Sequence, residues 1–230
     1  MNIAYIGYGK MGRAVEAAAQ ERGHTTGVVI DNPTDWAERL ENLRRCDIAV
    51  EFSTPTTAFD NILRCFELGV PVVSGTTGWH NRLDEVVDIC RKRGGKLLVA
   101  SNFSIGMNIM FELNRRLAVL MDGREDYSVS ISETHHIHKL DAPSGTAITL
   151  ANGIKEVSTR VPGPITSHRI GEVPGIHEVV YDSGVDTLTL RHEAKSRKGL
   201  ALGAVLAAEY LAAHAPGYYT MRNVIVNCEL

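Results

Sequence analysis

The sequence lacks the features that mark membrane-spanning, nucleic-acid-binding and disulfide-stabilised proteins. No segment approaches the roughly 20 consecutive apolar residues of a membrane-spanning helix, and no charged and apolar leader precedes the first strand-like residues. There is no basic run, and a net charge of −3 argues against nucleic acid or an anionic membrane as a partner. The 4 cysteines are scattered and form no Cys-x-x-Cys pair. We therefore expect reduced thiols and a cytoplasmic location.

Regularly alternating segments fill the first half of the chain. The 230 residues are 44% hydrophobic and 22% charged, as expected for a soluble globular protein with one large domain or two small ones. Strand-like runs cover residues 1–6, 26–30, 47–52, 70–74 and 96–100, with helix-like segments between them. This alternation predicts a parallel sheet, whose ligands bind beyond the carboxyl ends of the strands.

A complete Gly-x-Gly-x-x-Gly motif follows the first of these strands and precedes a helix-like segment. The motif consists of Gly7, Tyr8, Gly9, Lys10, Met11 and Gly12. In dinucleotide-binding folds such glycines allow a tight turn close to a pyrophosphate, and an acid about 20 residues later holds the ribose hydroxyls. Asp31 ends the second strand at that spacing. We predict a dinucleotide site here, with an ordinary glycine-rich turn as the alternative.

Three further turns are expected at the same edge of the sheet. They span residues 52–55, 75–78 and 100–103, and most of their residues are small or bear hydroxyl groups, as a loop lying against a cofactor requires. Each turn alone would be unremarkable, but their shared position favours a binding role. The residues expected to contact the cofactor are Phe52, Gly75, Thr76, Thr77, Ala100, Ser101, Asn102 and Phe103.

After residue 102 the pattern changes. A long apolar helix-like segment at 108–121 precedes a strand-like run at 127–132. Two more strand-like runs, 176–182 and 186–192, are joined as in a hairpin. These segments predict a second domain with an antiparallel or mixed sheet. Because the far face of such a sheet needs a cover, we expect a homo-oligomer, with a solvated face as the alternative.

The stretch from residue 133 to 147 places proton-transferring side chains before a helix start. It contains His135, His136, His138 and Lys139, followed by Ser144, Gly145 and Thr146. Histidine and lysine carry protons or positive charge, and backbone N–H groups at a helix start bind anions. We therefore predict a site for a small anion that is protonated during reaction. Arg197, in a basic turn, could reach that anion from a second side or be solvated.

Two other interpretations of this stretch remain. His135 with His138, and His136 with Asp141, are near enough in sequence to hold a metal, although no further His or Cys cluster offers a third or fourth ligand. We therefore expect no metal. The stretch could also be a polar surface loop, but the Pro-Ser-Gly-Thr helix start argues against this because it leaves amide groups unpaired.

The pattern Glu-x-His-His-x-x-Lys-x-Asp-x-Pro-Ser-Gly-Thr-Ala at residues 133–147 resembles the signature of the 4-hydroxy-tetrahydrodipicolinate reductase family. The likeness extends to residues 7–12, 75–78, 100–106 and 196–197, so it covers nearly the whole chain in order. The resemblance implies an α/β protein with two domains. A Rossmann-type parallel-sheet nucleotide domain would comprise 1–104 and 198–230, and an α+β substrate domain with an open mixed sheet, 105–197, would join four subunits.

The resemblance also implies roles for individual residues. His135 matches the family's proton donor and acceptor, and Lys139 its other proton donor. The residues matching positions that bind or orient a small dicarboxylate substrate are His136, Ser144, Gly145, Thr146 and Arg197. Residues 7–12, Asp31, 75–77 and 100–103 match the NADH or NADPH site.

Cofactor preference stays open because Asn32, rather than a basic residue, follows Asp31, so the usual partner of a 2′-phosphate is missing there. Lys10 and Arg13 could still meet that phosphate. Two rival functions also remain. Another nicotinamide-dependent dehydrogenase would share the first half without needing the histidine-lysine stretch. A dinucleotide sensor would bind the cofactor without turnover.

Overall fold

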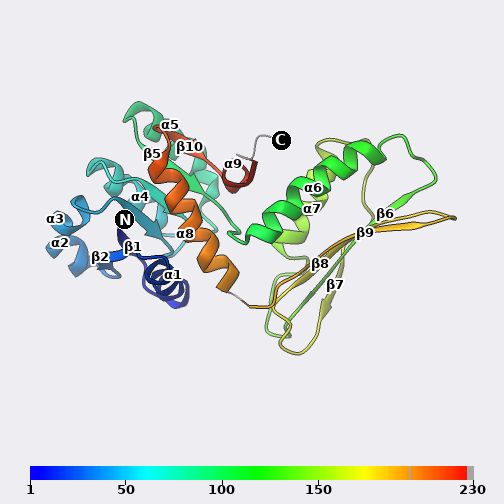
Figure 1. The fold of residues 1–230 in the computed structure, drawn as a ribbon, viewed down its shortest axis with the longest axis horizontal. Helices are drawn as coiled ribbons and strands as arrows, with labels where there is room; N and C mark the ends of the chain where they lie inside the picture. Colours follow the sequence, from blue (N-terminus) through cyan, green and yellow to red (C-terminus); the bar gives the residue numbers. More distant parts are fainter. Residues whose placement is uncertain (197, 227–230) are drawn as a thin grey trace. The chain divides into compact units, whose positions relative to one another are not determined.

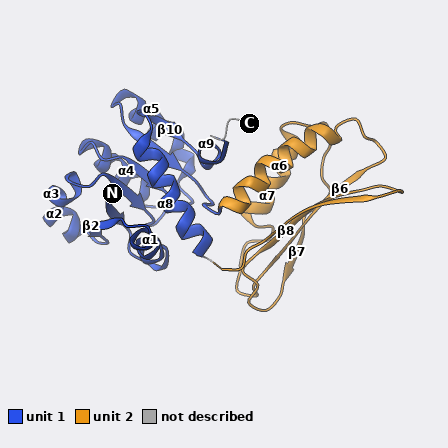
Figure 2. Ribbon diagram, in the orientation of Figure 1, with its two compact units in different colours: residues 1–104, 198–230 blue, residues 105–197 orange. Residues whose placement is uncertain are grey.

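The computed structural model describes residues 1–196 and 198–226, which fold into two compact units (Figure 1). Unit 1 combines Met1–Ser104 with Lys198–Leu230, and unit 2 is Ile105–Arg197 (Figure 2). Unit 1 is therefore discontinuous in sequence. In the described part of the chain, no helix is both long and apolar enough to cross a membrane.

Unit 1 is built on a six-stranded sheet in the order β10-β5-β4-β3-β1-β2, and all its strand pairs are parallel. Its strands are β1 (Asn2–Ile6), β2 (Thr25–Ile30), β3 (Ile48–Glu51), β4 (Val72–Ser74), β5 (Lys96–Val99) and β10 (Gly217–Tyr219). The predicted Rossmann-type parallel sheet is confirmed. Strand β10 was not predicted from sequence, because three residues after a proline are too short to show a period.

Helices cover both faces of this sheet. Alternate residues of a strand point to opposite faces. Ala4 and Ile6 of β1 pack with the core that includes α4 and α5, whereas Ile3 and Tyr5 are buried on the other side, where α1 and α8 lie together. The helices are α1 (Lys10–Glu21), α2 (Pro33–Glu38), α3 (Leu40–Arg44), α4 (Ala58–Glu67), α5 (Leu83–Lys92), α8 (Lys198–Ala213) and α9 (Met221–Val226), with a 3₁₀ turn at His80–Arg82.

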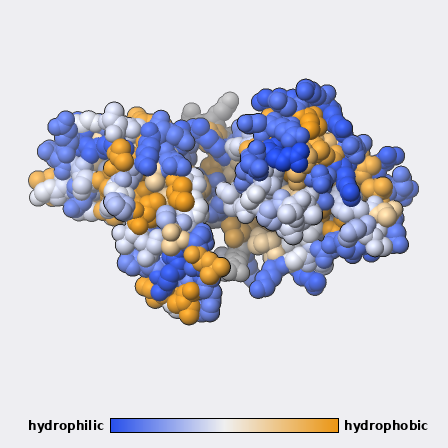
Figure 3. Space-filling model, turned by 180° about the vertical axis from the view of Figure 1, so that it is seen from behind, coloured by the Kyte–Doolittle hydropathy of each residue, from blue (hydrophilic) through white to orange (hydrophobic). Residues whose placement is uncertain are grey.

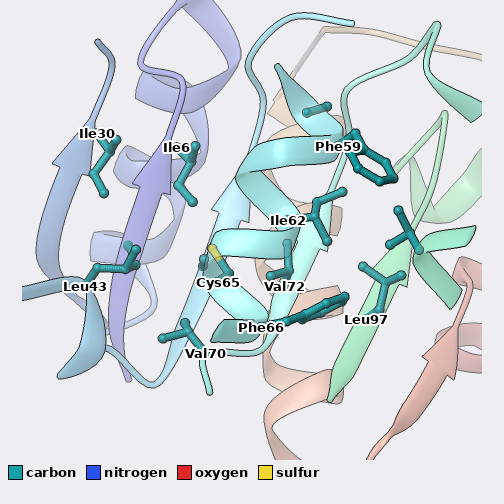
Figure 4. Packing of buried hydrophobic residues seen from close by; sticks show 14 of the residues in the cluster. Ile6, Ile30, Leu43, Phe59, Ile62, Cys65, Phe66, Val70, Val72 and Leu97 are labelled. Carbon is teal, nitrogen blue, oxygen red and sulfur yellow. The ribbon is translucent and has the colours of Figure 1, made fainter. Parts of the chain in front are cut away.

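Helix α4 shows how the sequence specifies this packing. Phe59, Ile62 and Phe66 recur at the three- and four-residue spacing of one helix face, and all are buried. The helix ends before Gly69, whose φ of +73° suits glycine. Figure 4 shows these side chains packed with residues of β4 and β5, including Val72.

Unit 2 is built on a four-stranded sheet in the order β7-β6-β8-β9. Its strands are β6 (Ser128–His135), β7 (Thr166–Arg169), β8 (Ile176–Asp182) and β9 (Thr187–Glu193). The β6–β7 pair is parallel and the other two pairs are antiparallel, so the predicted mixed sheet and the β8–β9 hairpin are confirmed. The strand expected at 127–132 instead runs to His135. Strand β7 was missed because Thr-Ser-His-Arg shows no apolar alternation.

Two helices, α6 (Ile105–Met121) and α7 (Gly145–Lys155), pack on one face of this sheet. Their side chains Met110, Leu150 and Ile154 meet Ile131 and Val179 in a buried core. The opposite face carries mainly hydroxyl and charged side chains, namely Ser128, Ser130, Ser132, Glu178, Val180, Thr189 and Arg191. On the side of the molecule seen in Figure 3, apolar patches are separated from one another by polar surface.

The core of unit 1 allows a matched test in helix α3. Leu43 is fully buried, whereas Leu40, one turn earlier, is 39% exposed. We expect Leu43→Ala to lower the free energy of unfolding by about 2–5 kcal/mol, because it leaves a cavity, and Leu40→Ala by less than about 1 kcal/mol. Urea unfolding of both variants measures the difference. Equal losses would show that Leu43 does not pack as described.

Candidate functional site

The three motif glycines of unit 1 each meet a different constraint. Gly7 has a φ of +84°, and a Cβ atom there would lie 2.2 Å from the Phe52 carbonyl oxygen. A Cβ atom at Gly12 would lie 2.3 Å from the Gly7 carbonyl oxygen, so this glycine lets α1 start close to the turn. Nothing lies within 4 Å of a Cβ atom at Gly9, so its backbone is open to a ligand. This division of roles is that of a pyrophosphate-binding turn.

Asp31 follows β2 and faces this turn. Its Oδ1 atom accepts a hydrogen bond from the Tyr8 backbone N–H at 2.6 Å. A pocket of about 470 Å³ extends from the turn past Asp31 to Trp36 and Arg64, and Phe52 also lines it. The open turn, the acid and the pocket together fit a dinucleotide. The contact of Asp31 with a ribose stays a prediction.

The other residues of the motif begin helix α1. Lys10 is exposed and Met11 half-buried. Arg13 donates from Nε to the Tyr8 carbonyl oxygen at 3.1 Å, and its guanidinium lies 4.8 Å from the centre of the Tyr8 ring. Asn32 caps α2, where its side chain accepts from the Asp35 N–H at 3.0 Å. No basic side chain therefore immediately follows Asp31.

The predicted turns after β3, β4 and β5 lie side by side. The rings of Phe52 and Phe103 are 5.6 Å apart, and Gly75 fits against both, since a Cβ atom there would lie 2.1 Å from the first and 2.8 Å from the second. Thr76 is buried, whereas Thr77 is exposed. The structure thus brings together turns that are more than 20 residues apart in sequence.

The turn after β5 continues this edge of the sheet. The backbone N–H of Ala100 donates to the Ser74 carbonyl at 3.1 Å, and Ser101 is exposed. The Asn102 side chain accepts from the Ser104 N–H at 2.9 Å. These bonds hold the turn beside β4, and the contact of Ser101 and Asn102 with a cofactor stays a prediction.

A buried acid that sequence reasoning missed connects these turns. Glu51, at the end of β3, has no exposed surface. Its carboxylate accepts hydrogen bonds from the N–H and hydroxyl of Ser53, from the Ser74 hydroxyl at 2.6 Å and from the Thr76 hydroxyl at 2.7 Å. An acid after an apolar strand was the available sequence signal, but only the fold reveals its partners.

In unit 2, the predicted substrate stretch spans the end of β6, a loop and the start of α7. Ser144 is the N-cap of α7, and its hydroxyl accepts from the Ala147 N–H at 3.2 Å. Nothing lies within 4 Å of a Cβ atom at Gly145, so the surroundings of this helix start are open. Thr146 is half-buried. An open helix start is suited to a carboxylate.

The histidines and the lysine of this stretch occupy different environments. His135 is the last residue of β6 and only 8% exposed. His138 is exposed, with Nε2 at 3.1 Å from Glu172. His136 is half-buried, and its Nδ1 atom has no hydrogen-bond partner within the described residues. Lys139 forms an ion pair with Asp141 at 2.8 Å. The alternative interpretation of this stretch as a polar surface loop is therefore wrong for His135, which is a buried strand residue.

Glu133, His135 and His177 form a buried cluster. Nε2 of His135 lies 3.3 Å from both Nε2 of His177 and Oε2 of Glu133. Burial lowers the pKa of His177 to about 4, so this imidazole is neutral at physiological pH. Burial also lowers the pKa of His135, although the Glu133 carboxylate opposes the shift. Among the described residues, these three form the group whose donor atoms are close enough to share a metal ion.

The acid at the centre of this cluster is itself held by several donors. Burial raises the pKa of Glu133, but hydrogen bonds from Ser144, Ser167 and Arg169 outweigh burial, so its pKa lies below the ordinary value. Arg169 also donates to the backbone carbonyls of Lys139 and Asp141. It thereby fixes the loop that carries the lysine.

Sequence reasoning missed Arg169 and His177. His177 lies on the inward side of β8, where Val179 and Tyr181 follow at alternate positions, so the period of the strand would have shown that it is buried. Nothing local to Arg169 indicated its role, because its partners lie about 30 residues earlier. Arg197 lies outside the described residues.

Two family models match consecutive parts of the chain. The model described as dihydrodipicolinate reductase, N-terminus, matches residues 1–103, and the one described as dihydrodipicolinate reductase, C-terminus, matches residues 106–225. The chain belongs to the dihydrodipicolinate reductase family. These reductases use NADH or NADPH, so the prediction of a nicotinamide dinucleotide is confirmed at the level of the family.

Curated relatives and a solved structure agree with this assignment. The chain is 46% identical to the 4-hydroxy-tetrahydrodipicolinate reductase of Christiangramia forsetii, with 98% of each chain covered, and 34% identical to that of Akkermansia muciniphila, with 94% of each covered. A dipicolinate-bound dihydrodipicolinate reductase from Paenisporosarcina sp. TG-14 has the same fold, with a TM-score of 0.81 and 22% identity over 97% of this chain and 99% of that one.

The motif glycines make separable predictions for folding and binding. We expect Gly7→Ala to lower the free energy of unfolding by more than about 2 kcal/mol, because it adds both backbone strain and a collision with Phe52. Gly9→Ala should fold normally, since its backbone is extended and uncrowded, but bind dinucleotide more weakly. Thermal unfolding and fluorescence titration with NADH measure the two effects. Normal stability of Gly7→Ala would contradict the described turn.

Proposed function

We propose that this protein is an NAD(P)H-dependent 4-hydroxy-tetrahydrodipicolinate reductase. It would reduce (2S,4S)-4-hydroxy-2,3,4,5-tetrahydrodipicolinate to tetrahydrodipicolinate, with loss of water, in lysine biosynthesis through diaminopimelate. The observation that carries the proposal is the 46% identity to a curated reductase over 98% of the chain. The loop before α7 supports it, because it combines an open helix start with a paired lysine and histidines.

In this proposal unit 1 binds the dinucleotide, which supplies a hydride to the substrate. Gly9 would let the backbone approach the pyrophosphate, and Asp31 would accept hydrogen bonds from a ribose. The Phe52–Phe103 contact and the Glu51 hydrogen bonds would fix the turns against which the cofactor lies. Such prior ordering lets binding energy be used for orientation rather than for arranging the loops.

Unit 2 would bind the dicarboxylate. The solved relative named above is described as bound to dipicolinate, a cyclic dicarboxylate. Ser144, Gly145 and Thr146 would place one carboxylate at the start of α7, where the positive end of the helix dipole attracts an anion. His136 and Arg197 would hold the other end, as their match to the family signature implies. The net charge of −3 makes such local positive groups the source of attraction for an anion.

Lys139 would donate a proton to the substrate, and His135 would act as its acid and base partner. The Lys139 ammonium lies 2.8 and 3.0 Å from the two oxygens of Asp141. This ion pair holds a proton-bearing group in the loop between β6 and α7. His135 is turned toward Glu133, so it would act from inside the cluster rather than from the surface. A proton delivered as negative charge builds on the substrate lowers the barrier.

We further infer a cytoplasmic homotetramer. The polar face of the unit 2 sheet would meet its copies, as in the family that the signature resembles. The buried free thiols of Cys46, Cys65 and Cys90 fit a reducing compartment. Size-exclusion chromatography with light scattering tests the tetramer, and a monomer at micromolar concentration would contradict it.

The role of Asp31 can be tested by replacing each of two acids that line the same pocket. We expect Asp31→Ser to raise the KM for NADH by about tenfold or more, since a charged hydrogen-bond acceptor for the ribose is lost. Asp60→Ser removes the same charge from the same pocket and should change KM little. Steady-state rates with NADH and NADPH measure both. Equal effects of the two substitutions would mean that Asp31 acts only through overall charge.

The activity itself is tested by following the oxidation of NADH or NADPH by absorbance. Substrate is generated in place from pyruvate and aspartate semialdehyde by the preceding synthase. We expect oxidation that requires the synthase. A folded protein that binds dinucleotide but gives no oxidation with either cofactor would overturn the proposal in favour of a sensor or another dehydrogenase.

Lys139→Ala should lower kcat by about 10²–10⁴-fold, the usual contribution of a proton donor. The matched control is Lys155→Ala, at the far end of α7, which removes the same charge and should leave kcat unchanged. The synthase-coupled assay measures both variants. Near-normal turnover of Lys139→Ala would exclude this lysine as the donor.

A further inference from the structure

The cluster of Glu133, His135 and His177 is built by strand pairing rather than by the loop. Glu133 of β6 lies directly opposite His177 of β8 in the antiparallel register. His135 follows Glu133 by two residues, so it points to the same face of the sheet. All three side chains are at least nine-tenths buried, and β6 and β8 are adjacent strands in the interior of the sheet.

The distances within the cluster are those of atoms that share a cation. Nε2 of His135 lies 3.3 Å from Nε2 of His177 and 3.3 Å from Oε2 of Glu133, and the remaining separation is 3.8 Å. A tetrahedral Zn²⁺ about 2.0–2.1 Å from each ligand would place neighbouring ligands about 3.3–3.4 Å apart. The three atoms therefore need to move by only a few tenths of an ångström.

The hydrogen bonds around the cluster use one carboxylate oxygen of Glu133 and leave the other free to act as a ligand. Oε1 of Glu133 accepts from the Ser144 N–H, the Ser167 hydroxyl and Arg169, at 3.0, 2.9 and 3.2 Å. Oε2 of the same carboxylate is buried and accepts no hydrogen bond within the described residues. It is directed at the two imidazoles.

His135 is oriented so that its Nε2 atom faces the other two side chains of the cluster. It donates a hydrogen bond to the backbone carbonyl of Pro174, and its Nδ1 atom lies beside Gly175. A neutral imidazole that donates through Nδ1 presents the lone pair of Nε2. A backbone carbonyl behind the ligand nitrogen is the usual second contact of a metal-bound histidine.

We propose that Glu133, His135 and His177 form a binding site for a divalent transition-metal cation of the Zn²⁺ type. Two imidazole nitrogens and one carboxylate oxygen suit Zn²⁺, Co²⁺ or Ni²⁺ rather than Mg²⁺ or Ca²⁺, which prefer oxygen ligands. The Ser144 hydroxyl, 3.3 Å from Nε2 of His177, or a water completes the coordination. Arg169 beside Glu133 weakens the affinity, since its charge opposes a cation.

The site also has a consequence for activity. A cation bound to Nε2 of His135 withdraws that nitrogen from proton transfer, so Zn²⁺ inhibits reduction reversibly and a chelator restores it. This inhibition rests on the proposed function, whereas cation binding does not. Cation binding is therefore measured in the absence of substrate.

Binding is tested on the whole chain, freed of metal by a chelator, with Zn²⁺ in equilibrium dialysis and no substrate. We expect one high-affinity Zn²⁺ per chain, and a loss of affinity of at least tenfold in His177→Asn and in Glu133→Gln. The matched control is His138→Asn, which removes an exposed histidine from the neighbouring loop. It should keep wild-type affinity for Zn²⁺.

Absorption spectra of the Co²⁺-loaded protein provide the second readout. Co²⁺ in a four-coordinate site gives intense visible absorption bands. Co²⁺ in a six-coordinate surface site gives weak bands. Intense bands in wild type that disappear in His177→Asn support the proposal. Far-ultraviolet circular dichroism and NADH binding by unit 1 show whether each variant is folded.

Three results would overturn the proposal. They are the absence of stoichiometric Zn²⁺ binding, equal affinity of wild type and His177→Asn, and weak Co²⁺ bands in wild type. If His177→Asn does not fold, the stoichiometry and the Co²⁺ spectrum of wild type decide. Zn²⁺ binding by a protein that shows no synthase-dependent oxidation would leave this site standing while overturning the proposed function.

Discussion

A buried carboxylate must be matched by hydrogen-bond donors, because the loss of hydration of a charge costs several kcal/mol. Both units are organised by this constraint. Glu51 in unit 1 and Glu133 in unit 2 are almost completely removed from solvent, and each lies at or near the carboxyl end of a strand. Their donors come from neighbouring strands and turns. Each acid therefore fixes the relative positions of segments that are distant in sequence.

The two acids differ in what they leave unsatisfied. The Glu51 carboxylate is bonded by Ser53, Ser74 and Thr76 through both oxygens, so it acts as a structural centre for the cofactor-side turns. Glu133 uses one oxygen for donors and directs the other at two imidazoles. Unit 1 thus has a rigid support beneath its ligand site. In unit 2 the acid leaves one oxygen without a hydrogen bond among the described residues, beside two buried imidazoles.

Local patterns made much of this predictable. The glycine turn and the helix start at Ser144 are each specified by residues within a few positions, and Asp31 by its spacing from the glycine turn. The structure places all three where these patterns indicate. The roles of Glu51 and His177 were missed because they depend on partner residues that are distant in sequence and that only the folded sheet brings near. The strand that ends at His135 was misjudged because a polar sequence was taken for a loop, whereas alternate residues of β6 point into the core.

The division of unit 1 into two sequence segments has a consequence for the order of folding. Helix α8 and strand β10 come from the last part of the chain, yet α8 packs so closely on the turn after β5 that a Cβ atom at Gly203 would lie 1.8 Å from the Phe103 carbonyl oxygen. During synthesis the ribosome releases all of unit 2 before α8. Until then the first 104 residues have one sheet face covered by α1 but not by α8, and they lack the edge strand β10. Contacts of such long sequence separation slow folding, and an exposed apolar sheet invites association with other chains. Unit 2 can complete its own core in that interval, so the nucleotide-binding unit begins first and finishes last.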